Sequence, residues 1–310
     1  MSALLERTRR PAPGRPQRIR RTRSETALPY AMVAPLLVFI FALALYPTVR
    51  TIYGAFIHQD PLSPPNHFVG FGNFTEVFSN PQVRESLWNT GLYIVFGVVL
   101  SVALGTWFAL LLQRPFRGRG VLLALIILPW ALPGVVEGVI WSWIYDPTFG
   151  VLNATLKGVG LIHSYQLWLG THRIETIFFI SLVQVWQITP LAALLVLASL
   201  QSIPTDLYEA ANVDGASGWQ SITRITLPLV RPGLAIAAVQ GLVMSLNIFD
   251  QVYVLNANAP LGASVMSQTY SITFADLNFG QGYALSLLAT VTTIVLSVLV
   301  VKAVYRKVVF

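Results

Sequence analysis

The 310-residue sequence contains no cysteine. Disulfide bonds, thiol catalysis and cysteine-ligated metal sites are therefore excluded. Four histidines occur, scattered at His58, His67, His163 and His172, and they lack the spacing of a metal-ligand set. We therefore expect no metal site in this chain.

Charged side chains are also scarce. They make up 11% of the residues, whereas hydrophobic residues make up 55%, and the mean hydropathy is +0.64. A soluble globule needs more polar side chains than this to cover its surface. The composition therefore predicts an integral membrane protein, with membrane lipid as an obligatory partner.

Sequence motifs for chemistry are missing as well. No GxxxxGK[ST] sequence occurs, so the chain lacks the loop that holds nucleotide phosphates in the Walker manner. No Ser/His/Asp set or carboxylate pair at helical spacing indicates catalysis on a substrate. No basic stripe with interleaved aromatic residues indicates a nucleic-acid partner. We expect no catalytic residue and no cofactor bound by this chain, so an energy source has to lie in another chain.

Six apolar runs are long enough to cross a bilayer core of about 30 Å, which takes roughly 20 helical residues. Membrane barrels instead show alternating segments of about ten residues. The sequence therefore predicts an all-α, polytopic membrane protein with six transmembrane helices. The predicted spans cover residues 30–54, 87–112, 121–145, 174–200, 232–255 and 281–303.

The positive charges predict the orientation. An even number of spans places both termini on one side, together with the 113–120 loop and the polar segment at about 201–231, and that side holds 16 of the 20 Lys and Arg. The positive-inside rule makes this side cytoplasmic. Residues 1–29 are expected to form a disordered basic cytoplasmic tail, and residues 30–310 the transmembrane domain. A cleaved targeting peptide is the competing interpretation of the N-terminal segment.

A polar stretch, EAANVDGASGWQSITRITLP at 209–228, separates two apolar spans. Thr205, after Pro204, is predicted to be the N-cap of a helix over about 206–213, which Gly215 ends in a left-handed turn. In a second short helix, Trp219, Ile222 and Ile225 recur every three residues and form an apolar ridge, and Pro228 ends the helix. Such short helices are marginal alone, so we expect this segment to pack on a partner, or else to lie flat on the membrane.

Polar side chains inside the spans are expensive in lipid, and they usually face a partner or a pathway. On one helical face of the fifth span we expect Gln240, Asn247, Asp250 and Gln251. The fourth span carries Gln184 and Gln187 ahead of Pro190, which is predicted to kink the helix. The third carries Pro129 and Pro133, then Glu137 and Trp141, a carboxyl group beside an aromatic face that suits sugar recognition. Interhelical hydrogen bonding is the alternative role for all of these residues.

The polar stretch resembles the EAA loop of permease subunits in binding-protein-dependent ABC importers. The matching positions are Glu209, Ala210 and Ala211, then Asp214, Gly215 and Ala216, then Ile225, Leu227 and Pro228, whereas Ile222 replaces a Phe that is frequent in sugar importers. From about residue 30 onward, PLLVFIFALALYP in the first span, VGFGNFTEVF at 69–78 and FGQGYALSLL at 279–288 are similar to maltose-type sugar permeases.

The resemblance implies an ABC importer permease fold of the maltose-permease type in a bacterial cell membrane. The implied partners are a second homologous permease, two copies of an ABC ATPase that binds ATP and Mg²⁺, and an external sugar-binding protein or lipoprotein. The implied substrate is a disaccharide or related sugar, with trehalose favoured. The implied ATPase-coupling residues are Glu209, Ala210, Ala211, Asp214, Gly215, Ala216, Trp219, Ile222, Ile225, Leu227 and Pro228.

Two other classes of protein remain open at this point. A proton-coupled secondary transporter would use Asp250 or Glu137 as its proton relay, but such carriers usually contain inverted repeats and no clear internal symmetry is visible. A membrane scaffold without transport would explain the polar stretch but not the polar face of the fifth span. Removing the polar stretch separates these classes, because only an ABC permease should lose an associated ATPase.

Overall fold

The computed structural model describes residues 23–62, 64–257 and 259–305, so most of the predicted tail at 1–29 lies outside the described residues. The chain divides into two compact units, residues 1–50 and 51–310. In the first unit, α1 (Arg23–Ile40) leads through a π-helical turn, η1 (Phe41–Leu45), into α2 (Tyr46–Gly54), which crosses the unit boundary. Helix therefore starts seven residues before the predicted first span.

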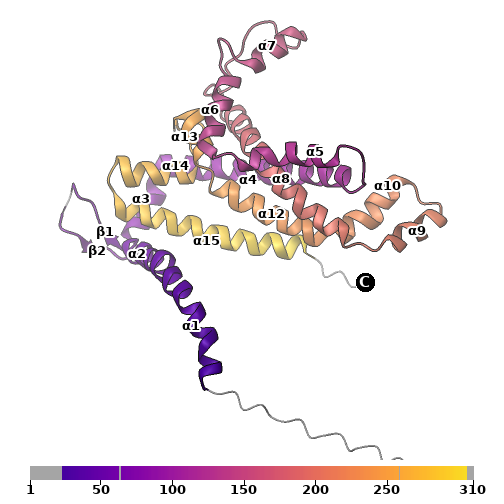
Figure 1. Cartoon of the computed structure of the whole chain (residues 1–310). Helices are drawn as coiled ribbons and strands as arrows, with labels where there is room; N and C mark the ends of the chain where they lie inside the picture. The colour runs from indigo at the N-terminus through magenta and orange to yellow at the C-terminus, as the bar shows by residue number, and fades with distance from the viewer. Residues whose placement is uncertain (1–22, 63, 258, 306–310) are drawn as a thin grey trace, which may run out of the picture. The chain divides into compact units, whose positions relative to one another are not determined.

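Three long helices form the frame of the second unit: α4 (Pro81–Leu112), α8 (Arg173–Gln201) and α15 (Phe279–Val304) (Figure 1). The start of α4 follows from local chemistry. The Asn80 side chain accepts a hydrogen bond from the Gln82 amide at 2.9 Å, and Pro81 occupies the first helical position, where no amide hydrogen is needed. Helix α8 continues through Pro190 without a break in its bounds.

Two of the six predicted spans are bent in the structure. Four helical stretches of the described residues are continuous, at Met32–Gly54, Pro81–Leu112, Arg173–Gln201 and Phe279–Val304. The third span divides into α5 (Arg119–Ile127), a 3₁₀ turn η2 (Leu128–Ala131) and α6 (Gly134–Ile144), with an angle of 102° between the two arms. Pro129 and Pro133 lie at this bend, where each removes a backbone donor, so the predicted span over 121–145 is present but broken into two arms.

The predicted fifth span is also interrupted. Helix α12 (Arg231–Leu246) ends before α13 (Asp250–Asn256), so the break lies at 247–249. A separate bend of 68° joins α12 to the preceding segment Gly218–Leu229, just ahead of the predicted span. Both the backbone amide and the side-chain amide of Asn247 donate to the carbonyl of Val243, at 3.2 and 2.8 Å. Asn247 thus ends α12, because its side chain competes for a helical acceptor. The prediction of a shared helical face for Gln240, Asn247 and Gln251 is therefore wrong.

The remaining elements are short and connect the helices. Strands β1 (Ile57–His58) and β2 (His67–Phe68) pair antiparallel, which is a small exception to the all-α prediction. They are followed by α3 (Gly72–Ser79). Helix α7 (Val151–Gly158) lies between α6 and α8, and α14 (Val265–Tyr270) with the π-helical turn η4 (Ser271–Ala275) precedes α15.

Small residues let the central helices α4, α8 and α12 approach each other closely. A Cβ atom on Gly105 of α4 would lie 2.7 Å from the Ala192 Cβ and 2.9 Å from the backbone nitrogen of Ala193. A Cβ on Gly233 of α12 would lie 2.5 Å from the Ser199 side chain of α8. Membrane helices commonly associate through such small-residue contacts, because apolar side chains gain little by leaving lipid.

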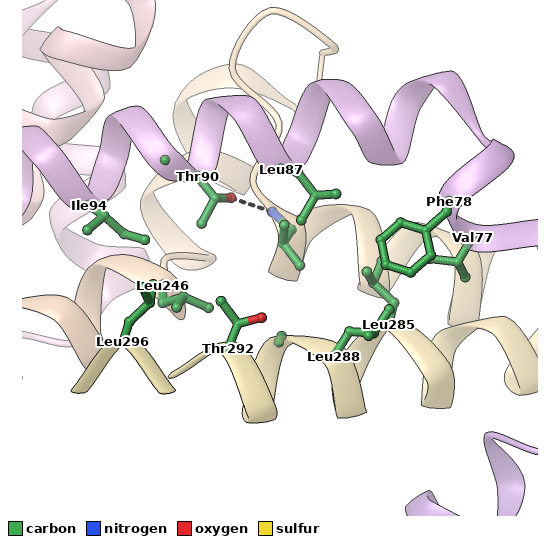
Figure 2. A pocket seen from close by; sticks show the side chains of 13 residues that line it. Val77, Phe78, Leu87, Thr90, Ile94, Leu246, Leu285, Leu288, Thr292 and Leu296 are labelled. Atoms are coloured by element: carbon green, nitrogen blue, oxygen red, sulfur yellow. Dashed lines mark hydrogen bonds between the residues drawn. The ribbon is translucent and has the colours of Figure 1, made fainter. Parts of the chain in front are cut away.

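An apolar groove separates α4 from α15 (Figure 2). Its volume is about 270 Å³, and it is lined by Phe78, Leu87 and Ile94 on one wall and by Leu285, Leu288 and Leu296 on the other. Thr90 lies at its base and accepts a hydrogen bond from the Val265 amide at 2.9 Å. This bond fixes the start of α14 against α4, because it satisfies an amide that the first turn of a helix leaves free.

Candidate functional site

The predicted coupling segment forms a compact helical protrusion, which we call the docking loop (residues 204–230). It consists of α9 (Thr205–Val213), α10 (Gly218–Ser221), the π-helical turn η3 (Ile222–Thr226) and α11 (Leu227–Leu229). Figure 1 shows α9 and α10 beyond the ends of α8 and α12, on the side of the second unit away from α13 and α14. Thr205 is the first helical residue and Pro204 is the N-cap without a side-chain bond, so the prediction of Thr205 as the N-cap is wrong.

Gly215 makes the turn between α9 and α10, as predicted. Its φ is +76°, its amide donates to Asn212 at 3.1 Å, and the amide of Ala216 donates to Ala211 at 2.9 Å. These two bonds and the left-handed residue constitute a Schellman motif, which satisfies the last carbonyls of α9. Glycine is favoured at Gly215 because a Cβ in this conformation is strained.

The start of α10 is closed by a capping box that the sequence analysis missed. The Ser217 hydroxyl accepts from the Gln220 amide at 3.3 Å, and the Gln220 side chain accepts from the Ser217 amide at 2.8 Å. The spacing of Ser217 and Gln220, S-x-x-Q, is the sequence signal that identifies this motif. Both ends of the turn are therefore fixed by local hydrogen bonds.

A second missed contact joins the two halves of the docking loop. The hydroxyls of Tyr208 on α9 and Thr226 on η3 lie 3.0 Å apart, and Thr226 also donates to the carbonyl of Ser221 at 3.2 Å. Tyr208 is half-buried and Thr226 is buried. This bond fixes α9 against η3, so the docking loop is a single folded protrusion and not two independent helices.

The predicted apolar ridge of the docking loop divides in the structure. Trp219 is 73% exposed, whereas Ile222 and Ile225 are half-buried. The largest outward-facing apolar surface comes from Trp219 together with Val213, which is 88% exposed. Of the other predicted coupling residues, Glu209, Ala210, Asp214 and Gly215 are exposed, and Ala211, Ala216, Leu227 and Pro228 are half-buried.

Three of the predicted pathway residues meet in one buried cluster at the opposite end of the second unit. The side-chain amide of Gln251 on α13 donates to Glu137 Oε2 on α6 at 3.1 Å and to Gln187 Oε1 on α8 at 3.0 Å. Glu137 is fully buried, and its second oxygen has no hydrogen-bond partner among the described residues. The cluster links three helical segments and leaves one buried acceptor free.

Trp141 lies one turn after Glu137 and faces aromatic neighbours. Its ring centroid is 5.7 Å from that of Trp186 and 5.2 Å from that of Tyr145. The indole nitrogen of Trp141 is buried and has no acceptor among the described residues. Trp141 and Trp186 also line a pocket of about 520 Å³ together with Thr189 and Pro190. The sequence analysis missed Trp186, whose contact with Trp141 depends on the packing of α6 against α8.

The other predicted pathway residues make no hydrogen bond to this cluster in the described structure, although Asp250 directly precedes Gln251. Gln184 donates to the carbonyl of Met244 at 2.8 Å, so it joins α8 to α12, and its side-chain oxygen has no partner among the described residues. Asn247 is exposed and caps α12. Asp250 lies against Gly134, where an added Cβ would be 2.5 Å from the Asp250 carboxylate. The predicted set is thus spread over three neighbouring environments.

The possible metal ligands are scattered in the described residues. Over the described ranges, no group of three or more His, Asp, Glu or Cys residues lies close enough to hold a metal ion. His58 and His67 face each other across the β1–β2 pair with ring centroids 5.0 Å apart, and no third ligand accompanies them in that part of the chain.

Comparisons with known proteins agree with this architecture. A family model described as "Binding-protein-dependent transport system inner membrane component" matches residues 101–309. The chain is 35% identical to the trehalose/maltose transport system permease protein MalF of Thermococcus litoralis, over 90% of this chain and 94% of that protein. It is 29% identical to the trehalose transport system permease protein SugA of Mycobacterium tuberculosis, over 86% of this chain and 84% of that protein.

A solved structure supports the fold. A chain of a bacterial ABC transporter that imports the acidic polysaccharide alginate matches with a TM-score of 0.77 at 23% identity, covering 89% of this chain and 94% of the other. The all-α permease fold predicted from the sequence is therefore confirmed. The chain belongs to the family of binding-protein-dependent transport system inner membrane components, and it is a multi-pass ABC importer permease.

Proposed function

We propose that this chain is one of two permease subunits of an ATP-driven importer for a disaccharide or related sugar, with trehalose as the favoured substrate. The relatives support a glycoside substrate, because their names refer to trehalose and maltose, to diacetylchitobiose and to sulfoquinovosyl glycerol. The second permease, a pair of cytoplasmic ATPases and an external sugar-binding protein complete the proposed assembly. ATP and Mg²⁺ would be bound by the ATPases.

The docking loop is the observation that carries this proposal. A short helical protrusion whose turn and helix ends are fixed by hydrogen bonds can transmit force as a unit. Its exposed Val213 and Trp219 provide apolar area that water disfavours and that a partner would cover. Glu209 is exposed on α9 and available for a polar contact with the ATPase.

The polar cluster of Glu137, Gln187 and Gln251 is our candidate for part of the sugar pathway. Amide and carboxyl groups form directional bonds with hydroxyls, and the nearby faces of Trp141 and Trp186 suit the C–H surface of a sugar ring. Glu137 and Trp141 each keep one polar atom without a partner in the described structure. Opening of the pathway would bring these groups to a sugar, with Gln184, Asn247 and Asp250 along its length.

The proposed mechanism links movement of the docking loop to opening of the pathway at the polar cluster. When the ATPases close on ATP, the docking loop moves as a rigid lever, and the helices rock so that the pathway changes from facing inward to facing outward. The breaks at Pro129 and Pro133 and at Asn247 are the natural bending points, because the helical hydrogen bonds are already interrupted there.

The test is a pull-down of the ATPase together with ATP-dependent sugar uptake by the reconstituted complex, comparing wild type with Trp219→Ala. Trp219 is a large exposed side chain, and its truncation should weaken ATPase association at least about tenfold if it is an interface anchor. Leu161→Ala is the matched control, because Leu161 is also 73% exposed but lies in the loop between α7 and α8, on the predicted external side.

The possible outcomes separate the candidate functions. Loss of both ATPase association and uptake in Trp219→Ala, with normal behaviour of Leu161→Ala, supports the proposal. Unchanged ATPase association and uptake in both variants would contradict the coupling role. Uptake that persists without any ATPase and follows the proton gradient would instead favour a secondary transporter.

A further inference from the structure

A pocket lies where the end of the docking loop meets the ends of two transmembrane helices. It has a volume of about 420 Å³ and combines residues of η3, α11, α12 and the last turn of α15. The lining residues are Thr223, Leu227, Pro228, Arg231, Leu234, Ala303 and Val304. None of these is acidic, and most of the wall is aliphatic, with one guanidinium group.

Arg231 lacks a compensating negative charge within the described part of the chain. The one ion pair found there joins Arg173 to Glu85, on the predicted external side, and no hydrogen bond to the Arg231 side chain is found there either. Two further cations adjoin the lining residues in sequence, Arg224 next to Thr223 and Lys302 next to Ala303. The acidic residues of the docking loop lie on α9 and its turn and do not line the pocket.

The pocket lies at the ends of membrane-spanning helices, where phospholipid headgroups are found. Arg231 is the first residue of α12. Ala303 and Val304 are the last two residues of α15, which is a candidate membrane span. Tyr305, which follows directly, is 49% exposed, and half-exposed tyrosines are typical of the membrane–water interface. In Figure 1 the end of α15 lies beside the start of α12, and these two helices pack against each other.

From this combination we infer that the pocket binds the phosphate of an anionic phospholipid from the cytoplasmic leaflet. The Arg231 guanidinium would donate to the phosphate oxygens, since its planar fork matches them. Leu227, Leu234 and Val304 would contact the glycerol and the first methylene groups. The Thr223 hydroxyl donates to the Trp219 carbonyl at 2.8 Å, so it is not available to donate to the phosphate.

Such a lipid would bridge the base of the docking loop to α15. The turn η3 and helix α11 are short, and α11 ends at Leu229, two residues before α12 begins at Arg231. A phosphate that neutralises Arg231 and fills the pocket would hold the docking loop base in place. The inference concerns this base alone and does not depend on which substrate the chain transports.

Native mass spectrometry of the purified full-length chain tests the inference, with phosphatidylglycerol and phosphatidylcholine as competing lipids. Wild type should retain phosphatidylglycerol preferentially, and Arg231→Gln should reduce that preference by more than the roughly fivefold effect of one Arg at a lipid surface, because its guanidinium also donates to the phosphate in the pocket. Arg114→Gln is the matched control: it removes the same charge from an exposed Arg in the predicted cytoplasmic loop between α4 and α5, and its effect should not exceed that of a surface charge.

A second variant separates a pocket from general surface charge. Ala303→Trp would fill the pocket from the exposed rim of α15 without changing any charge, and it should also lower phosphatidylglycerol retention. The inference is overturned if Ala303→Trp retains the lipid, if Arg114→Gln loses as much as Arg231→Gln, or if inorganic phosphate alone displaces the lipid.

Discussion

Gln251 donates hydrogen bonds from one side-chain nitrogen to both Glu137, at 3.1 Å, and Gln187, at 3.0 Å. The three residues come from α13, α6 and α8, and 114 positions separate Glu137 from Gln251 in the sequence. The contact joins α6 and α13, which both begin where a predicted span is broken. Gln251 thus donates to one oxygen of the buried Glu137 carboxyl group, and the other oxygen has no partner in the described structure.

Replacing Gln251 with Leu should destabilise the protein. The change removes the Gln251 donor from the buried Glu137 carboxyl group, and an unsatisfied buried polar group costs about 1–3 kcal/mol. The measurement is the midpoint temperature for loss of monodisperse protein in detergent. In the double variant Glu137→Leu/Gln251→Leu, part of the loss should be recovered, because the buried carboxyl group is gone and only Gln187 Oε1 has lost its donor. Strictly additive effects of the two substitutions would contradict a direct interaction.

Gly105→Ala should separate α4 from α8. The added Cβ would lie 2.9 Å from a backbone nitrogen of α8, and backbone cannot move aside as a flexible side chain can. We expect a loss of about 1–3 kcal/mol, as for other overpacked sites, measured by thermal unfolding. Gly91→Ala on the same helix is the control, because nothing lies within 4 Å of the added atom. Equal melting temperatures for the two variants would contradict the close packing.

Gly215→Ala should weaken coupling without affecting insertion into the membrane. An L-residue at φ +76° costs about 1–2 kcal/mol in left-handed conformation, so the Schellman turn would loosen. ATPase association measured by pull-down should fall severalfold. Gly218→Ala serves as the control, since its surroundings are equally open but its φ is not positive. If Gly218→Ala has the larger effect, the turn geometry is not what the coupling requires.

The loop after α6 should respond to pH through Asp146. The Thr148 hydroxyl at 2.6 Å, and then the amides of Phe149 and Thr148, hold the pKa of Asp146 below its ordinary value. Because the pKa is lowered on folding, the carboxylate stabilises the turn above its ordinary pKa, and this contribution is lost as pH falls through the lowered value.

Amide hydrogen exchange over residues 146–150 measures this effect. Protection in wild type should not change between about pH 7 and pH 5, which lies above the ordinary range of an Asp carboxyl group. Asp146→Ala should exchange faster throughout this range. Asp60→Ala is a control on a different loop, where Asp60 accepts from the Leu62 amide at 2.7 Å, and it should leave residues 146–150 unchanged. A wild-type turn that loosens between pH 7 and pH 5 would contradict the assignment.

The sequence by itself determined the features that depend on neighbouring residues. Apolar length predicted the approximate position of the spans, whereas the orientation expected from the charge distribution stays a prediction. The helix–glycine–helix form of the docking loop was also predicted, because a left-handed turn at Gly215 needs only local backbone chemistry. The capping box of Ser217 and Gln220 also depends only on neighbouring residues, and the S-x-x-Q spacing in the sequence predicts it.

The tertiary structure alone decided which polar side chains meet. A uniform helical periodicity placed Gln240, Asn247 and Gln251 on one face, but the side chain of Asn247 ends α12 and turns the chain before Gln251. The contacts of Glu137 with Gln251 and of Trp141 with Trp186 depend on the 102° bend of the third span and on how closely α6 packs against its neighbours. Local sequence does not encode such packing, since it follows from the combined shape of several helices.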